Sequence, residues 1–308
     1  MVKLLLTGAI NYSKEQLNKI KSLGFDIVFV QDERVPLKID VSDINAVVCN
    51  GLFLYNDIRK FKNLKFIQLT SAGFDRVPLD YIKKNEIKLF NAKGVYSIPM
   101  AEWVILKILE IYKKSRKFYE AQRKRKWEKQ RELLELTDKT LAIIGYGDVG
   151  KEIAKRIKVF GVNVIGVSRK NRYSTLVDEY FTLGDLDLVL KKSDIIVLTL
   201  PYSKETHHII DKKKIAIMKD NSVLINVSRG KIINEKDLIE AIKEDKFLGV
   251  ALDVFDEEPL NEDNELWDLE KVIVSPHNSF VSDKTNERLF NVIKANLKSF
   301  LENKYFGR

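Results

Sequence analysis

The chain alternates short apolar runs of strand length with longer segments in which apolar residues recur every three or four positions. In its first part, the capping-box pattern Ser13-x-x-Gln16 opens a helix that we expect to end near Gly24. Strands separated by helices predict a parallel sheet. The expected strands are Lys3–Thr7, Phe25–Val30, Ala46–Asn50, Lys65–Thr70 and Ile87–Phe90.

The pattern changes near Gly94, and a long apolar helix over Ala101–Lys117 is expected to carry the chain into a second domain. A final helix within Ser282–Lys304 has an apolar stripe along one face and is expected to return to the first domain. The second domain again alternates strands with helices. Its expected strands are Thr140–Ile144, Val162–Val167, Asp194–Leu200, Val223–Val227, Leu248–Val254 and Val272–Ser275.

These elements predict an α/β fold of two domains, with a Rossmann dinucleotide-binding domain inserted in a flavodoxin-like substrate domain. We expect residues 1–98 to form the first part of the substrate domain, residues 99–280 the dinucleotide-binding domain, and residues 281–308 the returning helix. Two crossings between the domains would suit closure about a hinge.

Between the first two strands of the second domain, three glycines follow the G-x-G-x-x-G spacing. Gly145 permits a tight turn, Gly147 leaves room for a pyrophosphate, and Gly150 lets the next helix pack close to the strand. That helix, which Gly161 is expected to stop, offers unpaired N–H groups to an anion. The alternative is a glycine turn used only for packing. We therefore predict a dinucleotide site formed by Gly145, Tyr146, Gly147, Asp148, Val149 and Gly150.

The end of the second strand indicates which dinucleotide binds. An NAD site has an acidic residue there, about 20 residues beyond the glycines, that binds the ribose 2′-hydroxyl. Here this place, 18 residues after Gly150 (168 − 150), holds Ser168, followed by Arg169, Lys170 and Arg172. A guanidinium can bind a 2′-phosphate through two hydrogen bonds. The sequence therefore predicts NADP(H) rather than NAD(H), bound by Ser168, Arg169 and Lys170, with a solvated basic loop as the alternative.

Polar residues follow the ends of the later strands, and the carboxyl ends of parallel strands meet at one edge of a sheet, where ligands bind. An arginine, a carboxylate and a histidine from different strands can therefore converge on one cleft. Each residue alone has a structural explanation as part of a turn. In chain order the strand ends carry Leu200 and Pro201, Val227 to Arg229, Asp253 with Glu258, and His277.

This set contains what hydride transfer to a 2-oxo acid needs. His277 can protonate the ketone oxygen near neutral pH. A carboxylate on its other ring nitrogen would orient the ring, and Glu258 is the candidate, with Glu257 as the alternative. Arg229 suits the substrate carboxylate, and Asp253 is expected to bond the nicotinamide carboxamide.

Two further histidines, His207 and His208, lie in SKETHHIID, and we interpret them as structural. Thr206 is the better candidate for a neighbour of the cofactor.

The composition is that of a globular protein, with 308 residues of which 45% are hydrophobic. No run of 18 apolar residues predicts a membrane span, and the start of the chain is interpreted as a strand rather than a signal. The single cysteine, Cys49, excludes an internal disulfide and fits the cytoplasm. Only three histidines occur, so no metal site is expected.

The net charge is +9 (53 − 44), and the charges are spread along the chain except for a basic cluster over Lys113–Arg131. We expect this cluster to form a helix that faces solvent or another subunit. A nucleic-acid patch is the alternative, and no nucleic acid is expected as a partner.

These residues resemble the D-isomer-specific 2-hydroxyacid dehydrogenase family over nearly the whole chain. The resemblance implies that the family's Arg–Glu–His set corresponds to Arg229, Glu258 and His277, and that the protein forms homodimers through its cofactor domains. The segments that carry it are LKFIQLTSAGFDRVPLD, NAKGVYSIPMAEWVILKILE, TLAIIGYGDVG, LPYSKETHHIIDKKKIAIMKDNSVLINVSRG, LDVFDEEPL and SPHNS.

The same resemblance implies the binding residues around the catalytic set. Backbone at Ala72 and Gly73 is expected to meet the substrate carboxylate, with Asn50 and Gly51 nearby. The cofactor contacts implied beyond the glycine turn are Leu200, Pro201, Thr206, Val227, Ser228, Asp253 and His277.

Two positions depart from the family pattern: Ser168-Arg169 replaces the acidic NAD marker, and Asn278 follows His277 where small or apolar residues are frequent. The first change is found in NADP-using glyoxylate and hydroxypyruvate reductases. We therefore expect a cytoplasmic NADPH-dependent reductase of small 2-oxo acids. The alternatives are an NAD-dependent D-lactate or phosphoglycerate dehydrogenase and, outside enzymes, a dinucleotide-sensing protein that acts like the family's corepressors.

Overall fold

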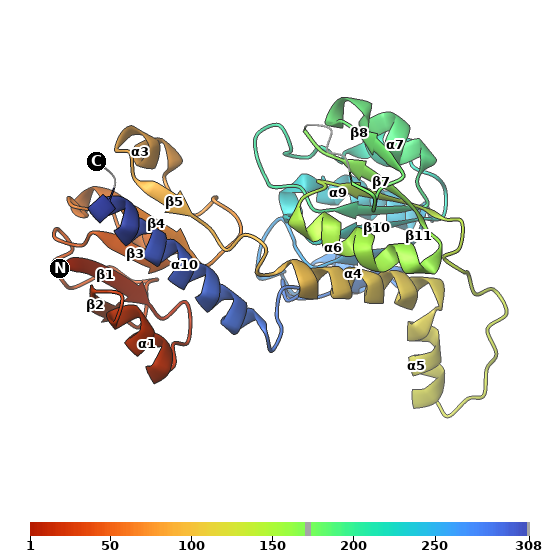
Figure 1. Ribbon diagram of the computed structural model, residues 1–308. Coiled ribbons are helices and arrows are strands. Elements are labelled where there is room, and N and C mark those ends of the chain that lie inside the picture. The colour runs from red at the N-terminus through yellow and green to blue at the C-terminus, as the bar shows by residue number, and fades with distance from the viewer. Residues whose placement is uncertain (170–173, 307–308) are drawn as a thin grey trace. The chain divides into compact units, whose positions relative to one another are not determined.

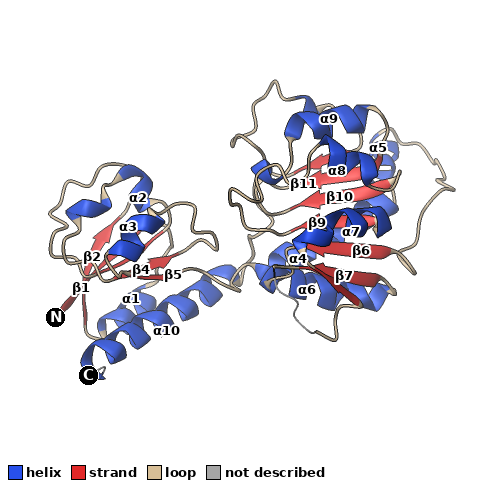
Figure 2. Cartoon of the chain, turned by 90° about the horizontal axis from the view of Figure 1, so that it is seen from above, coloured by secondary structure: helices blue, strands red, loops and turns tan. Residues whose placement is uncertain are grey.

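The structure is a computed structural model that describes residues 1–169 and 174–306. The chain divides into two compact units, one of residues 1–96 with 282–308 and one of residues 97–281. Each unit is built around a parallel sheet with helices on both faces (Figures 1 and 2). The predicted fold class, two α/β domains of which one is a Rossmann domain, is confirmed.

Among its described residues, the first unit has five parallel strands and four α-helices. The strands are β1 (Val2–Thr7), β2 (Phe25–Val30), β3 (Ala46–Cys49), β4 (Phe66–Leu69) and β5 (Lys88–Phe90); the helices are α1 (Lys14–Lys21), α2 (Leu52–Tyr55), α3 (Leu79–Lys84) and α10 (Thr285–Phe306), with a 3-10 turn η1 (Ile58–Lys60). The strand order is β2-β1-β3-β4-β5, the flavodoxin-like order, which reverses direction between β1 and β3.

Alternation along β1 divides the apolar core of the first unit between two faces. Leu4 and Leu6 pack with the apolar stripe of α10 and with Ile20 of α1, whereas Leu5 packs on the other face with residues of α2 and α3. Figure 2 shows α1 and α10 on one side of the sheet and α2 and α3 on the other. The predicted capping box is confirmed, because Ser13 and Gln16 exchange both capping hydrogen bonds.

In the second unit, the residues that the structure describes form seven parallel strands. They are β6 (Thr140–Ile144), β7 (Asn163–Val167), β8 (Glu179–Phe181), β9 (Ile195–Leu198), β10 (Ser222–Asn226), β11 (Phe247–Leu252) and β12 (Val272–Val274). Their order is β12-β11-β10-β9-β6-β7-β8, which contains the Rossmann arrangement with its reversal between β6 and β9.

Helices cover both faces of this sheet. Ile143 faces α4 and α6, and Ile144 faces α7, α8 and α9. The helices are α4 (Ser97–Tyr112), α5 (Ser115–Arg123), α6 (Asp148–Ile157), α7 (Leu186–Lys192), α8 (Lys212–Ile217) and α9 (Glu235–Lys243), with 3-10 turns η2 (Lys158–Phe160), η3 (Leu183–Asp185), η4 (Gly230–Ile232) and η5 (Glu265–Trp267).

The prediction for the long helix and the basic cluster was wrong in two places. One helix was expected over Ala101–Lys117, but α4 ends at Tyr112 because Lys114 adopts the left-handed conformation with a φ of 50°. The basic cluster was expected to be helical to Arg131, but α5 ends at Arg123, where Arg125 is left-handed and the Lys126 N–H bonds the Ala121 carbonyl.

Candidate active site

The glycine turn lies between β6 and α6, and two of its glycines are required by the protein itself. Gly145 has a φ of +106°, and a Cβ there would lie 2.7 Å from the Leu200 nitrogen, so the turn passes close to the end of β9. Gly150 faces β6, because a Cβ there would lie 2.9 Å from Ile143 Cγ2. Both observations match the tight turn and the close helix packing that a dinucleotide turn needs.

Gly147 is different, because its missing Cβ leaves open space. A Cβ there would contact only the Gly145 carbonyl oxygen, at an ordinary 3.7 Å. Gly147 is also the N-cap of α6, and no side chain caps that helix. Packing in the described residues therefore does not explain Gly147, whereas a pyrophosphate against the first N–H groups of α6 would need both the space and the donors. The residues present fit a dinucleotide.

The other predicted residues of the turn lie in different surroundings. The Tyr146 side chain is buried, with its ring edge-on to Tyr180 and its hydroxyl 3.1 Å from Ser174 Oγ. Only the Tyr146 backbone therefore belongs to the turn. Asp148 and Val149 are half-buried in the first turn of α6.

The end of β7 carries the residues predicted to select the cofactor. The Ser168 N–H bonds the Phe181 carbonyl at 3.2 Å, which ties it to the end of β8. Arg169 is exposed, and its charge helps lower the pKa of Glu205, after the larger effects of the Ser203 hydroxyl and the Glu205 N–H. Lys170 and Arg172 lie outside the described residues.

The loop after β9 is closed by Thr206. Its hydroxyl accepts a hydrogen bond from the Ser203 N–H at 2.7 Å and donates to the Pro201 carbonyl at 2.9 Å. Leu200 and Thr206 are buried and Pro201 is exposed. Thr206 therefore shapes this loop, and its predicted contact with a cofactor stays a prediction.

The two histidines that follow stack with ring centroids 3.8 Å apart. The His208 N–H bonds the Lys231 carbonyl at 2.8 Å, and its ring lies 3.9 Å from the Asp256 carboxylate. Burial and the nearby Glu235 raise the pKa of Asp256. These contacts join the loop after β9 to the loops after β10 and β11.

The loop after β10 presents Arg229. Asn226 holds it, because its side chain accepts from the Ser228 N–H at 3.0 Å and donates to the Arg229 carbonyl at 3.0 Å. Val227 and Ser228 are buried. A Cβ at Gly230 would lie 1.9 Å from the Phe255 carbonyl carbon, so only glycine lets this loop lie directly against the loop that carries Glu258.

His277 and Glu258 form a close polar pair. His277 Nδ1 lies 2.7 Å from Glu258 Oε2, and the Phe255 N–H bonds Glu258 Oε1 at 3.1 Å. Partial burial alone would raise the pKa of Glu258, but the hydrogen bond and charge of His277, the Phe255 N–H and the charge of Arg229 together lower it. The structure therefore pairs His277 with Glu258 and not with the alternative, Glu257.

The backbone at His277 is strained and held by Asp253, a role that no sequence pattern indicated. His277 has a φ of +49°, a conformation that costs energy for a residue with a side chain. Asp253, which is 1% exposed, accepts from the Asn278 N–H at 2.8 Å, the Ser279 N–H at 3.0 Å and the Ser275 hydroxyl. Asp253 thus fixes the loop that presents His277, and its predicted bond to a nicotinamide stays a prediction.

The substrate-side residues predicted in the first unit lie after β3 and β4. Asn50 and Gly51 donate their backbone N–H groups to a buried carboxylate, Glu33, which no sequence motif indicated. Ala72 is exposed, and its carbonyl accepts a hydrogen bond from Asn91, while the Gly73 carbonyl accepts from Ser71. The backbone N–H groups of Ala72 and Gly73 remain candidates for a carboxylate.

Among residues 1–169 and 174–306, no cluster of three or more His, Cys, Asp or Glu side chains is arranged to hold a metal ion. Within the same described ranges, no helix combines the length and the apolar character that a membrane crossing requires.

The chain is similar to proteins of one family. Residues 105–279 match the model of the D-isomer specific 2-hydroxyacid dehydrogenase, NAD binding domain. D-3-phosphoglycerate dehydrogenase of Methanocaldococcus jannaschii is 31% identical over 98% of this chain, which spans 58% of that relative's length. Glyoxylate reductase of Thermococcus litoralis is 33% identical over 77% of this chain and 74% of its own length.

The fold comparison agrees. A glyoxylate reductase from Paecilomyes thermophila superimposes with a TM-score of 0.87 at 26% identity, over 98% of this chain and 96% of that chain. The names of these proteins differ in substrate, so they indicate the reaction class and not the acid that this chain uses.

Proposed function

The chain belongs to the D-isomer specific 2-hydroxyacid dehydrogenase family, and from that premise we propose that it reduces small 2-oxo acids, such as glyoxylate or hydroxypyruvate, with NADPH. The observation that supports this most is the 2.7 Å pairing of His277 with Glu258, on a loop that lies against the Arg229 loop. All three residues follow strands of the sheet that also carries the glycine turn.

In the proposed reaction a bound reduced nicotinamide supplies the hydride that adds to C2 of the 2-oxo acid. As the ketone oxygen gains negative charge, His277 gives it a proton. Because Glu258 engages Nδ1, the proton comes from Nε2, and the Glu258 carboxylate stabilises the charged ring before transfer. The Arg229 guanidinium holds the substrate carboxylate through two hydrogen bonds and so orients C2.

The preference for NADPH rests on the end of β7. Ser168 stands where an NAD-specific site has a carboxylate, and Arg169 beside it is exposed and available to a 2′-phosphate. Position 168 holds no acidic residue, so no carboxylate there repels the phosphate.

The proposed function is tested by following NADPH oxidation at 340 nm across a panel of 2-oxo acids and repeating the panel with NADH. We expect turnover of a short 2-oxo acid and a higher kcat/KM for NADPH than for NADH. Turnover with NADH alone would reject the cofactor assignment and favour the NAD-dependent alternatives. No turnover with either cofactor, while dinucleotide still binds, would favour a sensing role.

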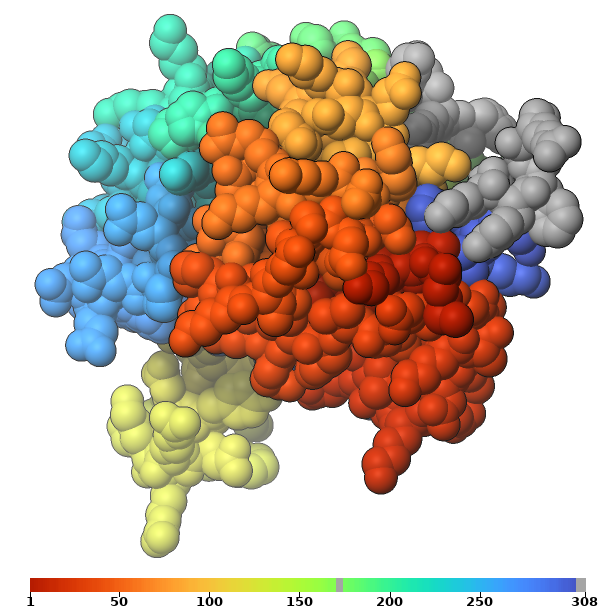
Figure 3. All heavy atoms as spheres, turned by 90° about the vertical axis from the view of Figure 1, so that its left-hand side faces the viewer, coloured from red at the N-terminus to blue at the C-terminus, as the bar shows by residue number. Residues whose placement is uncertain are grey.

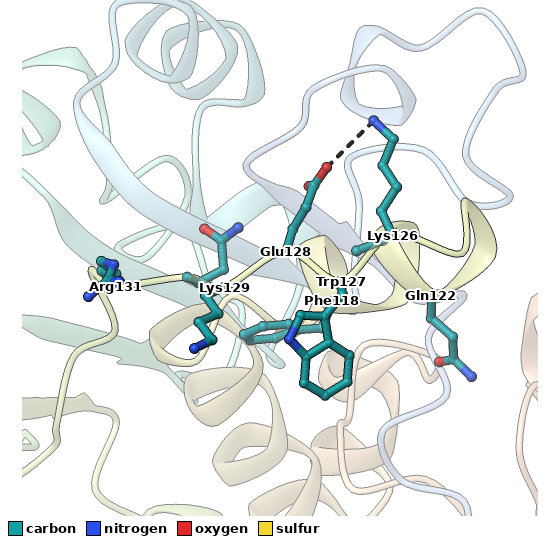
Figure 4. A pocket seen from close by; sticks show the side chains of 9 residues that line it. Phe118, Gln122, Lys126, Trp127, Glu128, Lys129 and Arg131 are labelled. Carbon is teal, nitrogen blue, oxygen red and sulfur yellow. Dashed lines mark ion pairs between the residues drawn. The ribbon is translucent and has the colours of Figure 1, made fainter.

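A homodimer through the second unit is part of the proposal. The segment after α5 leaves Trp127 94% exposed, and a cavity of about 680 Å³ lies beside it, lined by Phe118, Ala121, Gln122 and residues 126–131 (Figure 4). Figure 3 shows this segment, in yellow, standing out from the surface. Exposed apolar surface of this kind is typical of an interface.

Sedimentation of the wild-type protein and of Trp127→Ala tests this. The wild-type mass should be that of two chains, and the variant should shift toward one. A monomeric wild type would contradict the homodimer. The cytoplasmic location expected from the single cysteine stays a prediction.

A further inference from the structure

Asn226 is a buried polar residue at the end of β10, where the neighbouring positions are apolar. It is 1% exposed, and the core residues around it are Val223, Leu224 and Ile225 before it and Val227 after it. Asparagine is uncommon in strands, and a buried amide costs free energy unless its polar atoms are paired. The contacts of its side chain should therefore explain why asparagine stands here.

The Asn226 side chain bonds the residues that follow the strand. Its Oδ1 accepts from the Ser228 N–H at 3.0 Å and from the Ser228 hydroxyl at 2.6 Å. Its Nδ2 donates to the Arg229 carbonyl at 3.0 Å, and that carbonyl also accepts from the Ile232 N–H at 3.2 Å. An aspartate could accept these bonds but not donate, and a serine has a single oxygen. The loop therefore uses both functions of the amide.

These bonds fix the backbone from which the Arg229 side chain extends. The guanidinium Nη1 donates to the Ser228 carbonyl at 2.7 Å, so the residue that Asn226 holds also orients the guanidinium. On the other side, Gly230 lies against the Phe255 carbonyl carbon, where a Cβ would be only 1.9 Å away. A planar guanidinium that binds a carboxylate through two hydrogen bonds needs a fixed position of this kind.

The loop of His277 does not depend on the Asn226 side chain. The main-chain carbonyl of Asn226 accepts from the Asp253 N–H at 3.0 Å, and the Asp253 carboxylate accepts from the Asn278 and Ser279 N–H groups. Replacing the Asn226 side chain leaves the carbonyl in place. Arg229 and His277 can therefore be disturbed separately.

We propose that Asn226 is a positioning residue for the reaction, because its amide holds Ser228 and Arg229 so that the guanidinium keeps the orientation in which it binds the substrate carboxylate. This inference rests on the proposed function, in which Arg229 binds that carboxylate. Asn226 is buried, so it acts through Arg229 and not by contact with the substrate. Loss of the amide should weaken substrate binding more than it slows proton transfer.

Steady-state rates of Asn226→Ala, with the 2-oxo acid that the wild type uses best, give the first test. KM should rise about tenfold, because a small displacement of a binding group is costly. The change in kcat and in the Kd for NADPH should stay within about threefold, since His277 and the glycine turn are held by other contacts. Asn226→Asp keeps the shape and the acceptor for Ser228 but loses the donor to Arg229, so KM should rise in it too, which keeps the test valid if Asn226→Ala does not fold.

Ser193→Ala is the matched control. Ser193 is also fully buried, and its hydroxyl donates to the Val189 carbonyl at 2.7 Å before β9, at the amino edge of the same sheet. Its loss should lower the free energy of unfolding, measured in urea, without changing KM. A KM that rises equally in Ser193→Ala would show that lost stability alone causes the effect, and the proposal would be rejected.

A double-mutant cycle shows whether Asn226 acts through Arg229. Arg229→Lys keeps a cation but replaces the planar donors with a flexible amine, which depends less on a fixed backbone. In that background Asn226→Ala should change KM by less than about threefold, because the two residues act as one unit. An undiminished tenfold effect there, or an unchanged KM in both Asn226 variants, would overturn the proposal. No turnover of any 2-oxo acid by the wild type would instead overturn the proposed function and this inference with it.

Discussion

The carboxyl edges of the two sheets differ in whether their backbone N–H donors already bind a negatively charged group of the protein. In the first sheet, backbone N–H donors at the reversal of strand order already bind Glu33. In the second, the reversal lies between β6 and β9, and Gly147 leaves open space at the uncapped start of α6. One edge is filled by the protein's own carboxylate and the other is open to an anion from outside. Similar parallel sheets therefore differ in the ligands they can hold.

A second buried carboxylate sharpens this comparison. Asp253 resembles Glu33, because each accepts hydrogen bonds from a hydroxyl and from two successive backbone N–H groups. Asp253, however, lies at the end of β11, away from the reversal, and anchors the loop of His277. The same arrangement therefore occupies the N–H groups after β3 in one sheet and fixes the loop that carries His277 in the other.

The largest expected effect tests whether the open edge carries the reaction. His277→Ala should lower kcat by about 10²–10⁴-fold, because the ketone oxygen loses its proton donor, while the Kd for NADPH stays within about threefold. Steady-state rates and fluorescence titration measure the two. His207→Ala is the matched control, because the His207 side chain is exposed and its removal should leave kcat nearly unchanged. Unchanged turnover in His277→Ala would remove His277 from the mechanism.

The next prediction distinguishes a glycine that leaves room for the cofactor, Gly147, from a glycine that the fold requires, Gly145. Gly147→Ala places a methyl group where the described residues leave space, so stability should hardly change while the affinity for NADPH falls about tenfold or more. Gly145→Ala should instead lower the free energy of unfolding by at least about 2 kcal/mol, because of its φ of +106° and the nearby Leu200 backbone.

Urea unfolding and calorimetric titration distinguish these outcomes. If Gly147→Ala binds NADPH as well as the wild type, the edge is not open to a pyrophosphate and the comparison between the sheets fails.

The sequence predicted the parts of this comparison that depend on local pattern. The glycine spacing identified the turn because each glycine meets a separate local need, and strand lengths and alternation gave the two sheets. Glu33 could not be found in this way. It lies between Asp32 and Arg34, and nothing in the sequence distinguishes it from its charged neighbours until β1 and β3 come together around it.

Other features of the structure could not be predicted from the sequence for the same reason. The left-handed backbone at His277 depends on hydrogen bonds that its loop donates to Asp253, 24 residues earlier (277 − 253), and the strand β8 depends on pairing with β7. The helix break at Lys114 and the end of α5 near Arg125 involve residues that do not favour left-handed backbone. Backbone propensity therefore could not predict where these helices end.

A smaller effect concerns which dinucleotide the open edge prefers. Ser168→Asp adds a carboxylate that repels a 2′-phosphate and can accept from a 2′-hydroxyl, so the ratio of Kd for NADH to Kd for NADPH should fall about tenfold. Asn163→Asp adds the same charge at the opposite end of β7, where it should leave the ratio unchanged. An equal shift in both variants would mean that only net charge matters.

The smallest expected effect concerns Glu258, a partly exposed carboxylate that does not lie at a reversal of strand order. The native state lowers the pKa of Glu258, so its charged form contributes stability above the pKa of the unfolded chain, about 4.3, and this contribution is lost as the pH falls through the lower native value. The Glu258 side chain is 36% exposed, so the contribution is small. The difference in free energy of unfolding between the wild type and Glu258→Gln should therefore shrink as the pH falls below about 4.3. Urea unfolding at several pH values measures it, and a difference that grows toward acid would mean that the His277 pairing does not hold Glu258 in its charged form.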